Sequence, residues 1–218
     1  MLRVDRLVLR EIRLPLKEPF RISSGVVAER RIFLLELHHP DGIVGWGECV
    51  AGEQPNYSAE TIDTAWMAIR EWVAPRVLGR TLTGPDAVRP LLERDFRGHL
   101  MAKAAVEMGC WDIAARLQNV PLSTLLGGTR DRIPTGISLG IQPSPEALVE
   151  RARAAHRQGY RKIKLKIAPE RDVAYVRAVR DALGPDVELM ADANSAYTLA
   201  DVRTLQQLDA FDLIMRSE

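Results

Sequence analysis

The chain has 218 residues and a mass of 24.4 kDa, which is enough to bury a core and excludes a small disulfide-stapled scaffold. Hydrophobic residues make up 46% of the sequence and charged residues 27%, values typical of a folded protein and not of a disordered one. The 30 Lys and Arg against 29 Asp and Glu are interspersed and form no basic stripe, so we expect no nucleic acid partner.

The N-terminal residues and the cysteines bear on the cellular compartment. Arg3, Asp5 and Arg6 place charges where a secretory signal needs an apolar core, and no apolar run approaches the ~20 residues of a membrane helix. Cys49 and Cys110 lie far apart without a CxxC partner, so we expect two buried free thiols. We therefore expect a cytoplasmic protein with no membrane partner.

The first part of the chain predicts a small antiparallel sheet followed by helices. Asp41-Gly42 is a turn signal between two apolar runs. From residue 58 onward the apolar residues recur at helical spacing, and Gly127-Gly128 closes the segment. We expect an α+β domain over residues 1–128. Strands are predicted over 4–16, 32–37 and 43–48, and helices over 62–75, 85–93 and 100–117.

After residue 128 the pattern alternates between strand and helix. Such alternation predicts parallel βαβ units, and residues 129–218 hold about three of them plus a trailing strand. A complete (β/α)8 barrel takes ~250 residues, so this α/β region is either a small open sheet or the first part of a barrel. Strands are predicted over 133–139, 162–167, 187–191 and 211–215, and helices over 145–158, 170–183 and 199–208.

The first candidate for chemistry is the strand Lys162-Ile163-Lys164-Leu165-Lys166-Ile167, in which the lysines share one face about 6.6 Å apart. One interpretation is an exposed edge strand with solvated lysines. A strand between two crossover helices should instead be central and covered. Repulsion among lysines inside a barrel would favour the neutral amine, which is a competent general base.

The second candidate is Asp192-Ala193-Asn194, which follows the next predicted strand. The carboxyl ends of parallel strands carry the sites of α/β folds, and oxygen ligands suit Mg²⁺. The alternative is an Asx turn without further function. Ser138, near the end of the strand over 133–139, is either a substrate contact or a small packing residue.

Five separated motifs carry a resemblance to a known family: residues 105–112 (AVEMGCWD), 120–128 (VPLSTLLGG), 138–140 (SLG), 164–166 (KLK) and 192–197 (DANSAY). At these residues the chain resembles the enolase superfamily, in the muconate-lactonising subgroup and its o-succinylbenzoate synthase / N-acylamino acid racemase branch. The resemblance implies an N-terminal capping domain on a (β/α)8 (TIM-type) barrel. It also implies a divalent metal, Mg²⁺ or Mn²⁺, that stabilises an enediolate formed when a base removes the proton α to a carboxylate.

The implied activity is that of a lyase, o-succinylbenzoate synthase, which dehydrates its substrate in menaquinone biosynthesis, or of an isomerase, N-acylamino acid racemase. The implied partner is a small-molecule carboxylate, and we expect a homo-oligomer. The resemblance assigns roles to seven residues: Lys166 as acid/base, Lys164 as its neighbour that touches the substrate carboxylate, Asp192 as metal ligand, Asn194 in support, Ser138 as a substrate contact, and Phe20 and Tyr57 in the two specificity loops (20–25 and 52–57).

The chain departs from the family at its last strand. The family ends this strand in Glu-Gln-Pro, which supplies the second metal ligand, whereas this chain reads Arg216-Ser217-Glu218 and places its glutamate one residue late. The third metal carboxylate and the lysine on the opposite face of the substrate belong to later strands. We therefore expect a truncated, frameshifted or incompletely recorded version of a longer enzyme. The alternative is an inactive chain that acts through dimerisation or partner binding.

Overall fold

The computed structural model describes residues 1–217, and contacts divide them into two compact units. The first unit comprises Met1–Pro15 and Glu29–Arg130, and the second comprises Leu16–Ala28 together with the residues from Asp131 onward. The predicted division at residue 128 stays a prediction. Residues 16–28, the tip of a long hairpin, have their contacts with the second unit although the sequence places them among the first strands.

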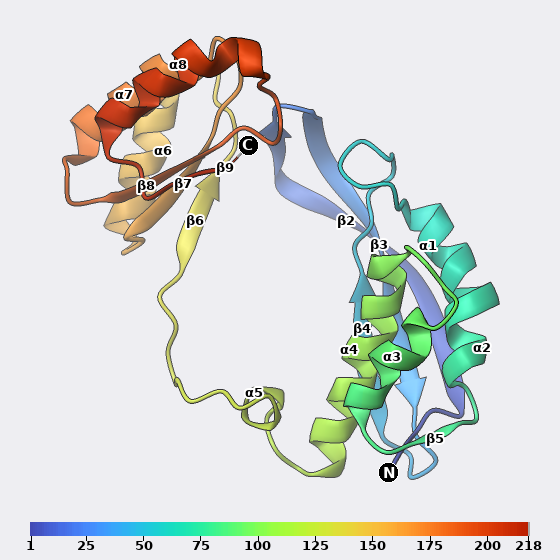
Figure 1. Cartoon of the computed structure of the whole chain (residues 1–218). Coiled ribbons are helices and arrows are strands. Elements are labelled where there is room, and N and C mark those ends of the chain that lie inside the picture. Colours follow the sequence, from blue (N-terminus) through green and yellow to red (C-terminus); the bar gives the residue numbers. More distant parts are fainter. Residues whose placement is uncertain (218) are drawn as a thin grey trace. The chain divides into compact units, whose positions relative to one another are not determined.

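The first unit contains the antiparallel sheet that the sequence predicts, in the strand order β2-β3-β4 (Figure 1). Strands β3 and β4 pair with Phe33 opposite Cys49 and His38 opposite Val44. A separate two-stranded sheet pairs β1 with β5. The strands are β1 (Leu2–Arg3), β2 (Arg6–Ile22), β3 (Gly25–His38), β4 (Val44–Cys49) and β5 (Thr81–Leu82).

The longest helix, α4 (Leu100–Leu117), has the predicted bounds. No helix within residues 1–217 is long and apolar enough to cross a membrane. The predicted helix end at Pro75 is wrong. Pro75 lies in the first turn of α2, where a proline is tolerated, and the helical stretch continues to Val77. The other helices of this unit are α1 (Ile62–Ala68), the π-helix η1 (Ile69–Val73), α2 (Ala74–Val77), the 3-10 helix η2 (Pro85–Ala87), α3 (Val88–Glu93) and α5 (Leu122–Leu125).

Helix α4 packs closely on strand β4 in the core of the first unit. Two glycines of β4 allow this approach, because a Cβ on Gly47 would overlap the Ala105 carbonyl and a Cβ on Gly45 would overlap the Gly109 carbonyl. From β3, the alternating residues Phe33, Leu35 and Leu37 point into the same core and are fully buried. The first unit therefore has a hydrophobic core of its own.

The second unit is a parallel sheet in the order β6-β7-β8-β9, as the alternation of strands and helices predicts. Each connection steps to the next strand in the same direction, and Figure 1 shows α6, α7 and α8 on one side of the sheet. The strands are β6 (Gly136–Leu139), β7 (Lys162–Lys166), β8 (Glu188–Asp192) and β9 (Met215–Ser217). The helices are α6 (Pro145–Arg157), α7 (Val173–Leu183), η3 (Leu199–Asp201), α8 (Val202–Gln206) and η4 (Gln207–Phe211).

The predicted strand over 211–215 is the main error in this unit. Residues 207–211 form the 3-10 helix η4, and Asp212 follows with a left-handed φ of 46°, so the chain becomes extended only at Met215. The predicted strand over 133–139 also begins late, at Gly136. Helix α7 begins at Val173 because the Asp172 side chain accepts the Val173 backbone N–H at 2.6 Å and caps the helix there.

Candidate active site

Strand β7 presents an apolar face to the helices and a cationic face on the other side of the sheet. Ile163 and Leu165 are fully buried in a cluster with residues of α6 and α7. Because side chains alternate along a strand, the lysines of β7 lie on the opposite face. β7 pairs with β6 on one side and β8 on the other, so the interpretation as an exposed edge strand is wrong. The Lys166 side chain is only 8% exposed and that of Lys164 29%.

One carboxylate pairs with both of these lysines. Lys166 and Asp192 are partners in the register of the neighbouring strands β7 and β8. The Lys166 Nζ donates to Asp192 Oδ2 at 2.6 Å, and the Lys164 Nζ lies 3.0 Å from the same oxygen. The sequence predicts a row of mutually repelling lysines, but the structure gives two of them a shared counter-ion.

The charge state of Asp192 follows from two opposed effects. Burial raises the pKa of this carboxyl group, because its charged form loses hydration. The hydrogen bonds from Lys166 and Lys164 and from the backbone N–H of Asn194 lower the pKa by more in total. The net pKa of Asp192 lies below its ordinary value, so the group is a carboxylate at neutral pH.

The chain turns sharply after Asp192. Asn194 and Ser195 both have left-handed backbone angles, with φ of 50° and 60°. The backbone N–H of Asn194 donates to Asp192 Oδ1 at 2.9 Å, and the Asn194 side-chain oxygen accepts from Lys166 Nζ at 2.7 Å. Asp192 therefore forms the Asx turn that was the alternative interpretation, and the same turn brings Asn194 to Lys166.

The hairpin tip contributes to this end of the sheet. The backbone N–H of Ile141 donates to the Arg21 carbonyl at 2.9 Å, and a Cβ on Gly140 would lie 3.4 Å from Phe20 Cδ2. The Ser23 Oγ donates to the Ala193 carbonyl at 2.6 Å. The sequence singles out the loop 20–25 but not Ser23, and no local signal could identify a partner 170 residues away.

The two remaining predicted contacts, Ser138 and Tyr57, lie in different units. Ser138 is exposed on β6, in register with Lys164 of β7. Tyr57 belongs to the first unit, and its side chain is 77% exposed. Their roles as substrate contacts stay predictions.

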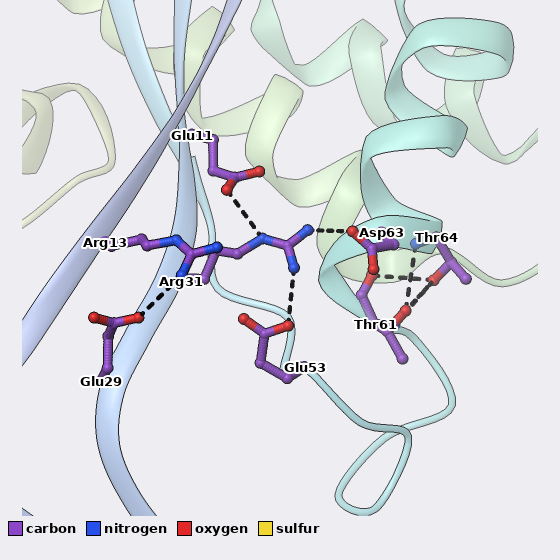
Figure 2. A network of polar contacts seen from close by, with 8 residues as sticks. All are labelled: Glu11, Arg13, Glu29, Arg31, Glu53, Thr61, Asp63 and Thr64. Carbon is purple, nitrogen blue, oxygen red and sulfur yellow. Dashed lines mark hydrogen bonds and ion pairs between the residues drawn. The ribbon is translucent and has the colours of Figure 1, made fainter.

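Figure 2 shows a charged network around Arg31 in the first unit, and this network includes Glu53, which precedes Tyr57 in the sequence and begins the segment 53–60. Arg31 donates to Glu53 at 2.9 Å and also contacts Asp63 and Glu11. At the other end of the segment, Glu60 accepts the backbone N–H groups of the first residues of α4 at 2.8 and 2.9 Å. The segment 53–60 is thus tied down at both ends.

The described residues do not complete a site for a divalent cation. Among residues 1–217 no three His, Cys, Asp or Glu side chains gather closely enough to hold a metal ion. Asp192 is a single carboxylate, and both of its oxygens already accept hydrogen bonds. Mg²⁺ prefers six oxygen ligands, so Asp192 and Asn194 would be part of such a site at most. Glu218, the residue that the sequence places one position late, lies outside the described residues.

Comparison with known proteins gives the class of this chain. Residues 5–127 match the family model of the mandelate racemase / muconate lactonizing enzyme N-terminal domain, and residues 147–216 match that of an enolase C-terminal domain-like region. The chain belongs to the mandelate racemase / muconate lactonizing enzyme family of the enolase superfamily. The resemblance drawn from the sequence motifs is confirmed.

Two curated relatives share 44% identity with this chain over 212 residues, which is 97% of its length. They are the o-succinylbenzoate synthase of Geobacillus kaustophilus and the N-succinylamino acid racemase of Thermus thermophilus. This chain spans 56% and 57% of their lengths, respectively.

Two solved structures have a similar fold. A member of the enolase superfamily from Listeria innocua superimposes with a TM-score of 0.94 at 36% identity, covering 100% of this chain and 58% of that one. A dipeptide epimerase from Enterococcus faecalis, complexed with Mg and a dipeptide, gives a TM-score of 0.89 at 28% identity. The superposition covers 99% of this chain and 60% of that one. The two units of this chain thus have the fold of the enolase superfamily.

Proposed function

We propose that the protein removes the proton α to the carboxylate of a small-molecule substrate, with Lys166 as the acid–base group. The observation that carries this proposal is the position of Lys166. Its amino group is buried at the carboxyl end of a central parallel strand, where it contacts both Asp192 and Asn194. The family of the chain and the names of its relatives support the same chemistry.

In the proposed step Lys166 first releases a proton to solvent, and the resulting neutral amine takes the proton from the α-carbon. The electron pair of the C–H bond stays on the substrate as an enediolate. Asp192 and Asn194 hold the Lys166 amino group in place. Lys164 supplies positive charge beside the substrate carboxylate. In a synthase the intermediate then loses hydroxide, which takes the proton from Lys166 and leaves as water. In a racemase a proton donor outside residues 1–217 returns a proton to the opposite face of the carbon.

The proposal extends to the whole protein. We propose that the parallel sheet is the first part of a (β/α)8 barrel under an N-terminal capping domain. We also propose that the whole protein uses a divalent cation, with Asp192 as one ligand, Asn194 in support and the others from outside residues 1–217. Further proposals are substrate contacts at Ser138, Phe20 and Tyr57, a homo-oligomeric state and a cytoplasmic location.

The two candidate activities, o-succinylbenzoate synthase and N-acylamino acid racemase, are supported equally. Relatives with both names have the same identity to this chain, and the two reactions share one base and one intermediate. No observation favours the alternative of an inactive chain that acts through dimerisation or partner binding.

The test is the rate of α-proton exchange of an N-succinylamino acid in D₂O with Mg²⁺, followed by ¹H NMR, with synthase activity measured in parallel. Lys166→Ala should lower both rates by about 10²–10⁴-fold, the range of a general base. The matched control is Lys162→Ala, which removes a lysine from the same strand and face but one that does not pair with Asp192. Activity that survives Lys166→Ala would refute the proposal.

A further inference from the structure

The peptide unit between Ala193 and Asn194 is held from both sides. Its carbonyl accepts from the Ser23 hydroxyl at 2.6 Å, and its N–H donates to Asp192 Oδ1 at 2.9 Å. A peptide plane that is fixed at both its C=O and its N–H cannot rotate without breaking one of these bonds. The hairpin tip therefore takes part in fixing the turn after β8.

This peptide plane decides where the Asn194 side chain points. Asn194 has a φ of 50° and the next residue a φ of 60°, and two successive left-handed residues other than glycine persist only where their surroundings hold them. From this conformation the Asn194 side-chain oxygen reaches Lys166 Nζ at 2.7 Å. A rotation of the plane would draw that oxygen away from the amino group.

We infer that Ser23 is a positioning residue for Lys166. It acts through the Ala193–Asn194 peptide, and it links docking of the hairpin tip to the geometry of the acid–base group. The inference rests on the proposed function for its effect on turnover but not for its effect on the turn. Other contacts of the tip, such as the ion pair of Glu18 with Arg151 at 2.6 Å, attach it to helix α6 without touching this peptide.

The experiment compares three variants of the whole protein by NMR amide exchange and by steady-state kinetics. Ser23→Ala should speed exchange of the Asn194 amide and lower kcat, each by about 3- to 10-fold, the range that one hydrogen bond covers. KM and the exchange of the Ile141 amide, which reports docking of the tip, should change less than about twofold. Ser23→Thr retains a hydroxyl and should restore both quantities.

Glu18→Gln is the matched control, because it removes a different contact of the same tip and should leave Asn194 exchange and kcat unchanged. If Ser23→Ala instead speeds Ile141 exchange and raises KM while kcat stays constant, Ser23 only docks the hairpin and the inference is wrong. Unchanged Asn194 exchange also overturns it. If the proposed function is wrong, this will show separately, as activity that survives Lys166→Ala. The amide-exchange measurement would still decide whether Ser23 holds the turn.

Discussion

A single carboxylate that serves two lysines makes Asp192 the electrostatic centre of the candidate site. Asp192→Asn would leave Lys164 and Lys166 near one another without their counter-ion. We expect a loss of about 1–3 kcal/mol in the free energy of unfolding at pH 7, below the cost for a fully buried pair because Lys164 is partly exposed. Urea titration measures this difference.

The pH dependence of this loss has a definite sign. The pKa of Asp192 is lowered in the folded state, so its contribution is complete above the unfolded pKa of about 4 and disappears as the pH falls further. The difference in the free energy of unfolding between the wild type and Asp192→Asn should therefore become smaller as the pH falls from 5 to the lowest pH at which both proteins remain folded. A gap that stays constant over this range would contradict the pairing.

The buried thiol of Cys110 gives a second prediction. Burial, with a smaller effect of Glu107, raises the pKa of Cys110 to about 12. Iodoacetamide at pH 8.5 should therefore leave Cys110 unmodified in the folded protein and alkylate it after unfolding in urea, as mass spectrometry would show. The contribution of this thiol to the free energy of unfolding is complete below about pH 8.5, the pKa of an unfolded cysteine. That contribution falls as the pH rises toward about 12. Alkylation of the native protein would contradict its burial.

At the scale of the elements, the contact between β4 and α4 depends on glycine. Gly47→Ala should lower the free energy of unfolding by about 1–3 kcal/mol, because the new Cβ has no space beside the Ala105 carbonyl. Gly52→Ala is the control, since its nearest neighbour, the Gln54 carbonyl, lies 3.4 Å from the added Cβ. Equal destabilisation by the two substitutions, in thermal or urea unfolding, would count against close helix–strand packing as the cause.

The helices and strands could be predicted from the sequence wherever a periodic pattern lies between clear signals. Helix α4 is the best case, and the alternating lysine strand is another. The end at Pro75 could not be predicted, because proline stops a helix in its interior but not in its first turn. The late start of β9 depends on the 3-10 helix before it and on the left-handed Asp212, neither of which has a distinctive pattern.

The candidate site was only partly predictable for a related reason. Lys164, Lys166, Asp192 and Asn194 lie at the ends of two neighbouring strands, and a parallel sheet brings such ends together. The pairing of Asp192 with both lysines depends on strand register, which the sequence leaves open. The contact of Ser23 with Ala193 depends on the tertiary fold alone.

At the scale of the whole molecule, each unit has its own core, and cavity-forming substitutions should separate them. Leu35 is fully buried in the first unit and Leu165 in the second. Leu35→Ala and Leu165→Ala should each cost about 2–5 kcal/mol, and hydrogen exchange should show the larger increase within the substituted unit. An equal increase in both units after either substitution would show that they unfold as one.

The hairpin has a consequence for protein engineering. Residues 16–28 precede most of the first unit in sequence, yet they contact residues of the second unit that come more than a hundred residues later. A chimera joined at residue 130 would therefore graft a foreign tip onto the native strand ends, and a fragment that begins at residue 131 would lack a piece of its own unit. Exchange of modules between homologues has to carry Leu16–Ala28 with the second unit, as a two-segment transplant.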